Sequence, residues 1–297
     1  MDDEDWLAQR FEQHRAHLRA VAYRMLGSLP ESDEAVQDAW LRLSRAGAEG
    51  VENLGGWLTT IVARVCLNVL QARKARPEQP AGLRMPDPLV SREGQANPKQ
   101  QALLADSVGL ALLVVLETLD PAERLAFVLH DMFDLPFEEI APMVGRSPTA
   151  TRQLASRARR RVRGAAAPPV ERDVARQREV VEAFFAAARA GDFDALVRVL
   201  HPDVVLRSDR QGVGEQRGAA RVARLALGGA RGGRTATVLP VVVNGAAGAL
   251  IVENGQLVTL MGFTVSGGKI VEIDGIVDPE RLSRIDLAAL TGPVQIE

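Results

Sequence analysis

The sequence of 297 residues is poor in cysteine, in aromatic residues and in net charge. A single cysteine, Cys66, excludes an intrachain disulfide and is typical of a reducing cytoplasm. Its apolar neighbours at helical spacing predict a buried, inert thiol, and no Cys/His cluster indicates a metal site. Aromatic residues make up only 4% of the chain, so we expect aliphatic, alanine-rich cores.

Long apolar runs are also missing. No uninterrupted apolar stretch reaches the roughly 18 residues of a membrane span. The acidic start, MDDEDWLAQR, lacks the apolar centre of a signal peptide. We therefore expect a cytoplasmic protein that does not associate with a membrane. The length is too great for one small domain and favours two or three.

The charge is unevenly distributed, although it sums to −2. Residues 1–56 carry eleven acids against six arginines, whereas residues 57–76 carry four basic residues and no acid. The strongest concentration is VGRSPTATRQLASRARRRVRG, from Val144 to Gly164, with seven arginines and no acid. An acidic face beside basic segments indicates one surface for a protein and another for a polyanion.

Apolar periodicity predicts an all-α first domain over residues 1–76. In its second helix, Val36, Ala39, Trp40 and Leu43 form a stripe that we expect to face the core. In its third helix, polar side chains lie opposite an apolar face, which comprises Leu58, Ile61, Val62, Val65, Val69 and Leu70. Such a polar face is able to stack on and hydrogen-bond unpaired bases, or it is an ordinary exposed helix face.

A proline-rich linker is expected over residues 77–98, where five prolines interrupt every periodic pattern. Its apolar residues Leu83, Met85, Leu89 and Val90 suggest that it docks onto another part of the protein. A second helical domain follows over residues 99–163. A short linker, GAAAPP, lies within residues 164–170.

The end of the second helical domain has a helix-turn-helix pattern. FEEIAPMV and SPTATRQLASRARRRV are separated by Gly145, and the second helix is basic and polar. We expect Thr151, Leu154, Ala155, Ala158 and Val162 to pack, with arginines and Gln153 projecting outward. Arginine reads guanine edges and glutamine reads adenine, while trailing arginines suit phosphates. The alternative is a solvated basic helix ahead of a linker.

From residue 171 onward the pattern changes to an α+β domain. A helix is followed by alternating, β-rich segments with Asn-Gly pairs at 244–245 and 254–255 and an SGGK turn. These signals predict an antiparallel sheet.

The helical part resembles the extracytoplasmic-function sigma factors. The residues that carry the resemblance are ESDEAVQDAWLRL, GGWLTTIVARVCLNVLQARKAR and DPAERLAFVLHDMFDLPFEEIAPMVGRSPTATRQLASRARRRV, which span residues 6–163 in order across a linker. The resemblance implies sigma domain 2 at 1–76, sigma domain 4 at 99–163, and a role in promoter recognition with RNA polymerase core. Contacts with the β′ clamp and β flap of the polymerase are implied.

Residue roles follow from the same resemblance. Asp33, Glu34, Gln37, Asp38 and Trp40 lie where this family binds the β′ clamp. Thr60, Arg64, Asn68 and Gln71 lie where the minus-ten strand is read, with Arg73 and Lys74 after them. Arg146, Ser147, Thr149, Thr151, Arg152, Gln153, Ser156, Arg157 and Arg160 lie where the minus-thirty-five duplex is read and held. The family usually has Asn at Arg64 and Asp at Asn68, which predicts an unusual minus-ten preference.

Residues 171–297 resemble the SnoaL-like cone fold that some sigma factors carry. Segments LRMPDPLV, SGGKIVEI and DPERL match three motifs of such proteins in order, with Asp278 where Asn is more frequent. Cone-fold enzymes use a carboxylate in an apolar pocket. The candidates here are Asp203, Asp209, Glu253 and Asp274, with His201 nearby. The only tyrosine of the chain is Tyr23, so the domain lacks a usual oxyanion donor, and we expect no catalytic residues.

The preferred interpretation is an alternative sigma factor, not an enzyme and without a cofactor. Its SnoaL-like domain would contact the linker and the sigma domains and regulate them in cis. One alternative is a DNA-binding regulator that never touches polymerase, and another is a ligand sensor or enzyme with a DNA-binding appendage. The acidic helix at 31–38 argues against the first alternative. The sparse polar inventory of residues 171–297 argues against the second.

Overall fold

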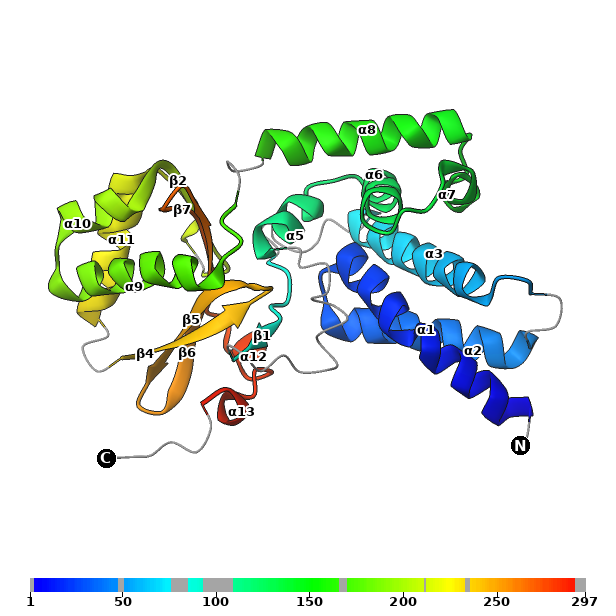
Figure 1. Ribbon diagram of the computed structural model, residues 1–297, viewed down its shortest axis with the longest axis horizontal. Coiled ribbons are helices and arrows are strands. Elements are labelled where there is room, and N and C mark those ends of the chain that lie inside the picture. The colour runs from blue at the N-terminus through cyan, green and yellow to red at the C-terminus, as the bar shows by residue number, and fades with distance from the viewer. Residues whose placement is uncertain are drawn as a thin grey trace. The chain divides into compact units, whose positions relative to one another are not determined.

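The computed structural model describes residues 3–47, 51–75, 85–92, 109–165, 170–210, 212–232 and 236–291. The chain forms two compact units, which are described separately. One unit holds helices from the first part of the chain, and the other holds a sheet, its covering helices and residues 85–92 (Figure 1). Most of the two expected linkers, and the first residues of the helical domain expected over 99–163, lie outside the described residues.

The first unit begins with three long helices, α1 (Asp3–Leu26), α2 (Leu29–Ala46) and α3 (Leu54–Ala75). Helix α2 starts at the N-cap Ser28 and ends at Gly47, whose φ of 69° suits glycine. The core between the helices is aliphatic, as expected from the few aromatics, and includes Leu18, Leu43 and Leu58. Cys66 is fully buried among them, and burial raises the pKa of its thiol to about 12, which confirms an inert cysteine.

The buried face of α3 differs in part from the expected stripe. It comprises Leu58, Thr59, Val62, Ala63, Cys66, Leu67 and Leu70. Ile61, Val65 and Val69 are only half-buried, because the buried face is rotated around the helix and contains the smaller residues Thr59, Ala63 and Cys66 instead. Within the described residues, α3 alone is long and apolar enough to cross a membrane by length and composition. This is weak evidence for a span, because core helices of soluble proteins have the same properties.

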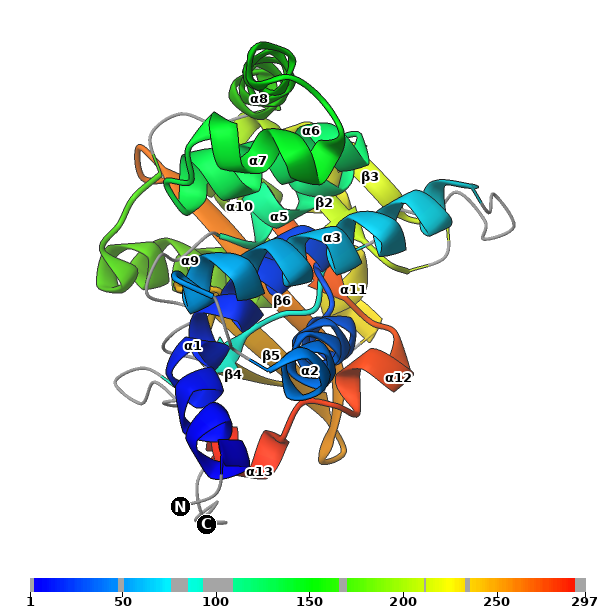
Figure 2. The same cartoon turned by 90° about the vertical axis from the view of Figure 1, so that its right-hand side faces the viewer.

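The unit continues with the short helices α5 (Leu110–Glu117, of which residues from Leu112 onward belong to this unit), α6 (Pro121–Phe127) and α7 (Phe137–Val144), the π-helical turn η1 (Val128–Met132), and the long helix α8 (Pro148–Ala165). Helix α6 begins at the N-cap Asp120 with Pro121 in its first turn, where the missing N–H of proline costs no hydrogen bond. Figure 2 shows α7 and α6 beneath α8, and both α6 and α7 pack on α8. This confirms an all-α arrangement with a helix-turn-helix.

The second unit is an α+β domain around a sheet of seven strands in the order β1-β4-β5-β6-β7-β2-β3. The strands are β1 (Val90–Ser91), β2 (Leu200–Ser208), β3 (Gly214–Arg217), β4 (Thr237–Val243), β5 (Ala246–Glu253), β6 (Gln256–Ser266) and β7 (Lys269–Ile276). The Asn-Gly hairpins are confirmed, since Asn244 and Asn254 have φ of 49° and 51° in the turns β4–β5 and β5–β6.

The sheet is not wholly antiparallel, which corrects the expectation. Strand β2 pairs with β7 in parallel, with Leu206 beside Ile273. Strand β2 comes before the meander β4 to β7 in the chain and pairs with its last strand, so no hairpin turn connects β2 and β7. Local turn signals therefore did not reveal it. His201 lies inside β2.

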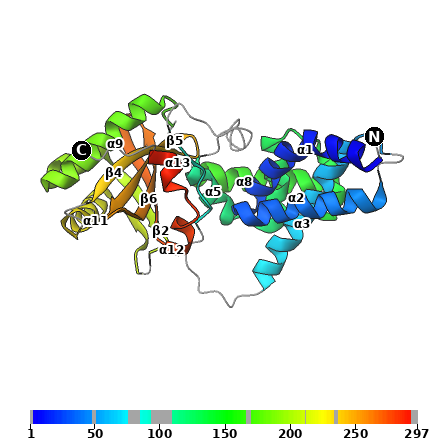
Figure 3. The same ribbon diagram turned by 90° about the horizontal axis from the view of Figure 1, so that it is seen from below.

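Helices cover one face of this sheet. They are α9 (Val174–Ala190), α10 (Phe193–Val199) and α11 (Ala219–Gly232), and their apolar residues share a core with Phe263, Val265 and Ile273 of the sheet. Two short helices, α12 (Pro279–Leu282) and α13 (Leu287–Thr291), lie on the other side of the sheet (Figure 3). The layer of α9 to α11 over a curved sheet is the expected cone-like architecture.

Candidate functional site

The turn between α7 and α8 presents α8 to solvent. Helix α7 ends at Gly145 in the left-handed conformation, and its backbone N–H donates to Ala141 O. The Ser147 hydroxyl then accepts from Ala150 N at 3.2 Å, which caps the start of α8. Three residues separate the helices, so α8 leaves at an angle to α7, as in helix-turn-helix proteins.

The outward face of α8 matches the sequence prediction. Ala155 and Ala158 are fully buried, whereas the polar residues between them are exposed. The exposed side chains that were expected to face DNA are Arg146, Ser147, Thr149, Arg152, Gln153, Ser156, Arg157 and Arg160. Thr151 is different, because it is fully buried and its hydroxyl donates to Ser147 O at 3.0 Å. Thr151 therefore packs the helix and does not present a group to a ligand in this structure.

Several arginines of α8 are already paired inside the unit. Arg157 and Arg161 donate to the two carboxylate oxygens of the buried Glu123 at 2.8 and 2.7 Å. The Arg152 guanidinium lies 5.1 Å from the ring centre of Phe137. Arg160 is exposed and forms no ion pair with any residue that the structure describes. The arginines thus differ in how freely they are available to a polyanion.

Helix α3 carries the second polar face. Arg64, Asn68 and Gln71 are exposed on one side, and Thr60 is half-buried, donating to Gly56 O at 2.9 Å. The basic residues that follow are engaged. Arg73 contacts Glu31 and donates to Leu26 O at 3.3 Å, and Lys74 is paired with Asp120. The pair lowers the pKa of Asp120, mainly through its hydrogen bond with Lys74.

The acidic helix α2 borders a hollow of about 410 Å³ against α1. Asp33, Gln37 and Trp40 line this hollow, and the Trp40 ring packs on Phe11 with 5.2 Å between ring centres. Asp33 and Asp38 are held in exposed ion pairs, Asp33 with Arg19 at 2.6 Å and Asp38 with Arg42 at 3.0 Å. Glu34 is exposed. Of the residues predicted to bind a protein, Asp33, Gln37 and Trp40 therefore share one accessible hollow, while Glu34 and the half-buried Asp38 lie outside its lining.

A buried arginine joins the two helical sets of this unit. Arg124 of α6 is 1% exposed, and its guanidinium donates to Arg24 O of α1 at 3.1 and 3.2 Å and to Glu117 at 2.8 Å. The Arg24 guanidinium lies 4.8 Å from the ring centre of Phe133. These contacts were not predicted from the sequence, since nothing local distinguishes Arg124 from an exposed arginine.

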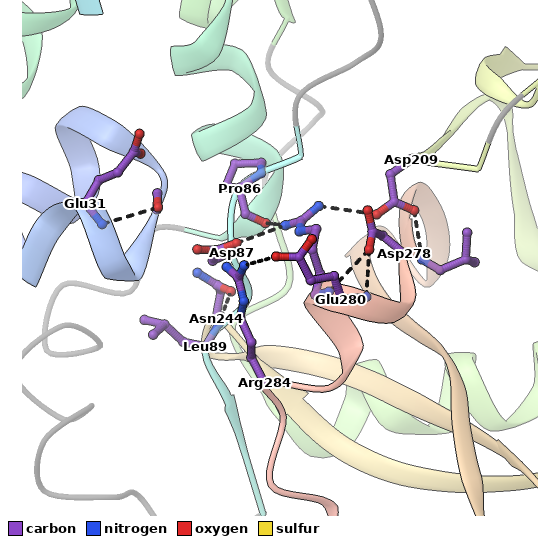
Figure 4. Close-up of polar contacts among 12 residues, drawn as sticks. Glu31, Pro86, Asp87, Leu89, Asp209, Asn244, Asp278, Glu280 and Arg284 are labelled. Atoms are coloured by element: carbon purple, nitrogen blue, oxygen red, sulfur yellow. Dashed lines mark hydrogen bonds and ion pairs between the residues drawn. The ribbon is translucent and has the colours of Figure 1, made fainter. Parts of the chain in front are cut away.

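In the second unit, the linker segment 85–92 is a strand of the sheet. Val90 and Ser91 pair with Val243 and Val242 of β4. Asn244 forms two hydrogen bonds with Leu89, the residue before Val90. The backbone N–H of Asn244 donates to Leu89 O at 2.8 Å, and its Oδ1 accepts from Leu89 N at 3.0 Å (Figure 4). Met85, Leu89 and Val90 are buried, which confirms that the linker docks onto another part of the protein.

Arg281 of α12 binds the beginning of the segment 85–92. Its guanidinium donates to Pro86 O at 2.6 Å and contacts Asp87 and Asp209 at 3.3 Å, around the residues drawn in Figure 4. Asp278 caps α12 by accepting from Glu280 N at 2.8 Å. Asp209 also accepts from Val277 N at 2.8 Å. The DPERL motif thus positions Arg281 on the linker.

The carboxylates considered for catalysis do not converge. Asp203 is exposed, Asp209 is used by Arg281, and Glu253 ends β5 at the edge of a cavity. Asp274 is buried and lies 3.4 Å from Arg207, which also contacts Glu272 and Glu215. Burial raises the pKa of Asp274 to about 7, and the repulsion of Glu272 adds to this against the attraction of Arg207. No group of His, Cys, Asp and Glu in the described part of the chain is able to hold a metal ion.

Comparison with known proteins agrees with this geometry. The family model for Sigma-70 region 2 matches residues 10–76, that for Sigma-70 region 4 matches residues 109–162, and that for the SnoaL-like domain matches residues 181–275. The chain is 40% identical to the ECF RNA polymerase sigma factor SigJ of Mycobacterium tuberculosis over 223 residues, 73% of this chain and 71% of that protein.

Two further likenesses cover almost the whole chain. A probable ECF RNA polymerase sigma factor, SigI of Mycobacterium tuberculosis, is 35% identical over 285 residues, 95% of this chain and 97% of that protein. The crystal structure of Mycobacterium tuberculosis SigJ superposes with a TM-score of 0.74 at 34% identity, covering 93% of this chain and 98% of that one. The family consists of transcription initiation factors, not enzymes, that act with RNA polymerase on promoter DNA, which implies a cytoplasmic protein. The chain therefore belongs to the ECF RNA polymerase sigma factors and carries a C-terminal SnoaL-like domain.

Proposed function

We propose that the SnoaL-like domain regulates this sigma factor in cis by holding the linker between the two sigma domains. The observation that carries the proposal is the incorporation of Val90 and Ser91 into the sheet of that domain as strand β1. The linker joins the part of the chain that contains α3 to the part that contains α6 to α8. A domain that binds the linker therefore controls how far those two parts can separate.

The lengths of the connecting segments limit how far each sigma domain can lie from the SnoaL-like domain. Ten residue steps separate Ala75, the end of α3, from the docked Met85, which limits that distance to about 35 Å. Nine steps separate Ala165, the end of α8, from Val174 of α9, which limits that distance to about 30 Å. With the linker docked, the SnoaL-like domain is tied by short segments to both DNA-binding parts. Releasing it removes the first tie.

A contact inside the sigma unit supports a closed resting form. Lys74, from the region assigned to the minus-ten strand, is paired with Asp120 at the start of α6. Lys74 must leave Asp120 before its ammonium group binds phosphate, so this contact between the two parts competes with DNA. Polymerase core or a small molecule would shift the balance by binding the open form better.

The residue roles belong to the same proposal. The α2 surface with Asp33, Glu34, Gln37, Asp38 and Trp40 binds the β′ clamp, and the α6–α8 part contacts the β flap. Thr60, Arg64, Asn68 and Gln71 read the minus-ten strand. The exposed face of α8 reads and holds the minus-thirty-five duplex. Most of these side chains are exposed, which supports the assignment; Asp38, Trp40 and Thr60 are half-buried, and Thr151 is the buried exception.

The test compares promoter-dependent transcription by polymerase core with the full chain, a chain ending at Asp278, and Arg281→Ala. The matched control is Arg284→Ala, which removes an exposed arginine of the same region whose ion pair among the described residues is with exposed Glu280. We expect severalfold changes in activity for Arg281→Ala and for the truncation, and none for the control. Equal activities from all four proteins at equal concentration would refute control in cis.

A further inference from the structure

The SnoaL-like domain contains a cavity of about 260 Å³ between its helices α9 and α11 and the sheet. Its wall is mainly apolar and includes Phe184, Leu206, Ile251, Met261 and Ile273. All lining residues belong to this one unit. Apolar cavities of this kind bind small molecules that leave water readily.

Small residues keep the cavity open. Helix α11 turns Ala226, Gly229 and Ala230 toward it, at the spacing of one helix face, where larger side chains would fill the space. A Cβ atom built on Gly229 meets nothing within 4 Å. Leu225, at the mouth, is 39% exposed. The pattern describes a preformed space with an apolar opening.

The polar residues that line the cavity are mostly donors, and the full set is Arg189, Arg207, Ser208, Arg210, Thr259 and Glu253. Of these, Arg207 is already paired with Glu215, Glu272 and Asp274. Ser208 Oγ accepts from Arg210 N at 3.1 Å, and its own hydroxyl proton has no acceptor among the described residues. Arg189 and Arg210 line the opening, are exposed, and their guanidinium groups form no ion pair within the described part of the chain. Among the described residues that line the cavity, Glu253 alone carries a carboxylate. An acceptor with negative charge fits this set of donors.

We propose that this cavity binds a small apolar molecule with one carboxylate, such as an aromatic or aliphatic monocarboxylic acid. The apolar body lies against Phe184, Ile251 and Met261, and the carboxylate faces Ser208, Arg189 and Arg210 at the opening. A cationic ligand is disfavoured by the two arginines. Asp274 plays no part, because Ile273 and Gly275 on either side of it line the cavity and alternate residues of a strand face opposite sides.

The cavity shares elements with the residues that bind the linker, but the binding proposal does not depend on linker binding. Val277 lines the cavity, and its N–H donates to Asp209, which also contacts Arg281. Val238 of β4 lines the cavity, and the same strand pairs with the linker at Val242 and Val243. The binding proposal stands independently of cis regulation, since it concerns occupancy and not transcription.

The experiment titrates the full chain with three rigid probes of one shape: 2-naphthoate, the neutral 2-naphthamide and the cationic 2-naphthylmethylammonium. Calorimetry gives each affinity. We expect 2-naphthoate to bind at least tenfold more tightly than the amide and the ammonium probe not to bind at all. Arg189→Gln with Arg210→Gln should weaken naphthoate about tenfold and change the amide less than threefold.

Two helix variants locate the site. Gly229→Leu should abolish binding of both naphthoate and naphthamide, because leucine covers the opening and is a better helix former than glycine. Arg224→Gln, on the exposed side of α11, should leave all affinities unchanged. Circular dichroism checks that each variant is folded. No binding of naphthoate at 5 mM, equal affinity for all three probes, or unchanged binding by folded Gly229→Leu would overturn the proposal.

Discussion

Asn244 and Leu89 are 155 residues apart in the sequence and are joined by two hydrogen bonds, one to each peptide group of Leu89. Replacing Asn244 by glycine keeps the positive φ of the turn but removes the acceptor of Leu89 N. A buried N–H without a partner costs about 1–3 kcal/mol. We expect Asn244→Gly to release the linker, seen as faster cleavage by protease between residues 77 and 98.

The other Asn-Gly turn provides the matched control. Asn254 has nearly the same φ, is exposed, and lies in the β5–β6 turn away from the linker. Asn254→Gly should leave the cleavage rate unchanged. Equal cleavage of both variants and the wild type would show that the Asn244 side chain does not hold the linker.

Separate variants of α8 should divide base reading from phosphate binding. Arg152→Ala and Gln153→Ala should each weaken promoter binding by about 1–3 kcal/mol if they make bidentate contacts with bases, with little effect on random duplexes. Arg160→Ala should weaken all duplexes alike and reduce the salt dependence of binding. Fluorescence anisotropy on specific and random duplexes makes the comparison. Identical losses on both duplexes for all three variants would contradict the assignment.

A charge reversal on α2 should affect polymerase binding and not folding. Asp38 is half-buried, and its exposed i,i+4 pair with Arg42 contributes at most about 0.5 kcal/mol to stability. We expect Asp38→Arg to reduce the affinity for polymerase core at least tenfold with an unchanged circular dichroism spectrum. Glu179→Arg, a reversal on exposed α9, is the control. Unchanged core affinity of Asp38→Arg would remove α2 from the interface.

The buried contacts of Arg124 should contribute more to the stability of the sigma unit than the exposed Lys74–Asp120 pair. Arg124 is buried with its partners Glu117 and Arg24 O, so Arg124→Ala should lower the free energy of unfolding by about 3–5 kcal/mol. Lys74→Ala removes an exposed ion pair and should change it by less than about 1 kcal/mol. Urea unfolding of the full chain measures both. A larger loss for Lys74→Ala than for Arg124→Ala would reverse this ranking.

The raised pKa of Asp274 predicts a stability that falls as pH rises. The folded protein holds the Asp274 proton to about pH 7, whereas the unfolded chain loses it near the ordinary value of 3.8. Folding is therefore favoured by this group at low pH, and that contribution is lost between about pH 4 and 7. Asp274→Asn should flatten the dependence of Tm on pH in this window while Arg207 keeps Glu272 and Glu215 as partners. A slope as steep as that of the wild type would exclude Asp274 as its source.

Local sequence patterns predicted many of the helices and hairpins correctly. The periodicity of α8 placed Ala155 and Ala158 inside, and the Asn-Gly pairs located two hairpins, because both signals arise from neighbouring residues. The linker strand, the parallel β2–β7 pair and the Arg281 contacts joined residues far apart in the sequence. Such pairings leave no periodic signal. Thr151 received two different predictions: helical periodicity placed it among the packing residues, which its burial confirms, whereas the family resemblance assigned it to DNA.

The place of β1 in the sheet has a consequence for the released form. Strand β1 covers Val242 and Val243 at the outer edge of β4, and further along this edge Pro240 lacks an N–H to offer to another strand. When the linker leaves, unpaired peptide groups beside a proline-blocked stretch become accessible to a β-strand of a second copy. Linker release thus exposes a short, unpaired strand edge on β4. Self-association of the opened protein should therefore rise with its concentration unless another chain pairs with that edge.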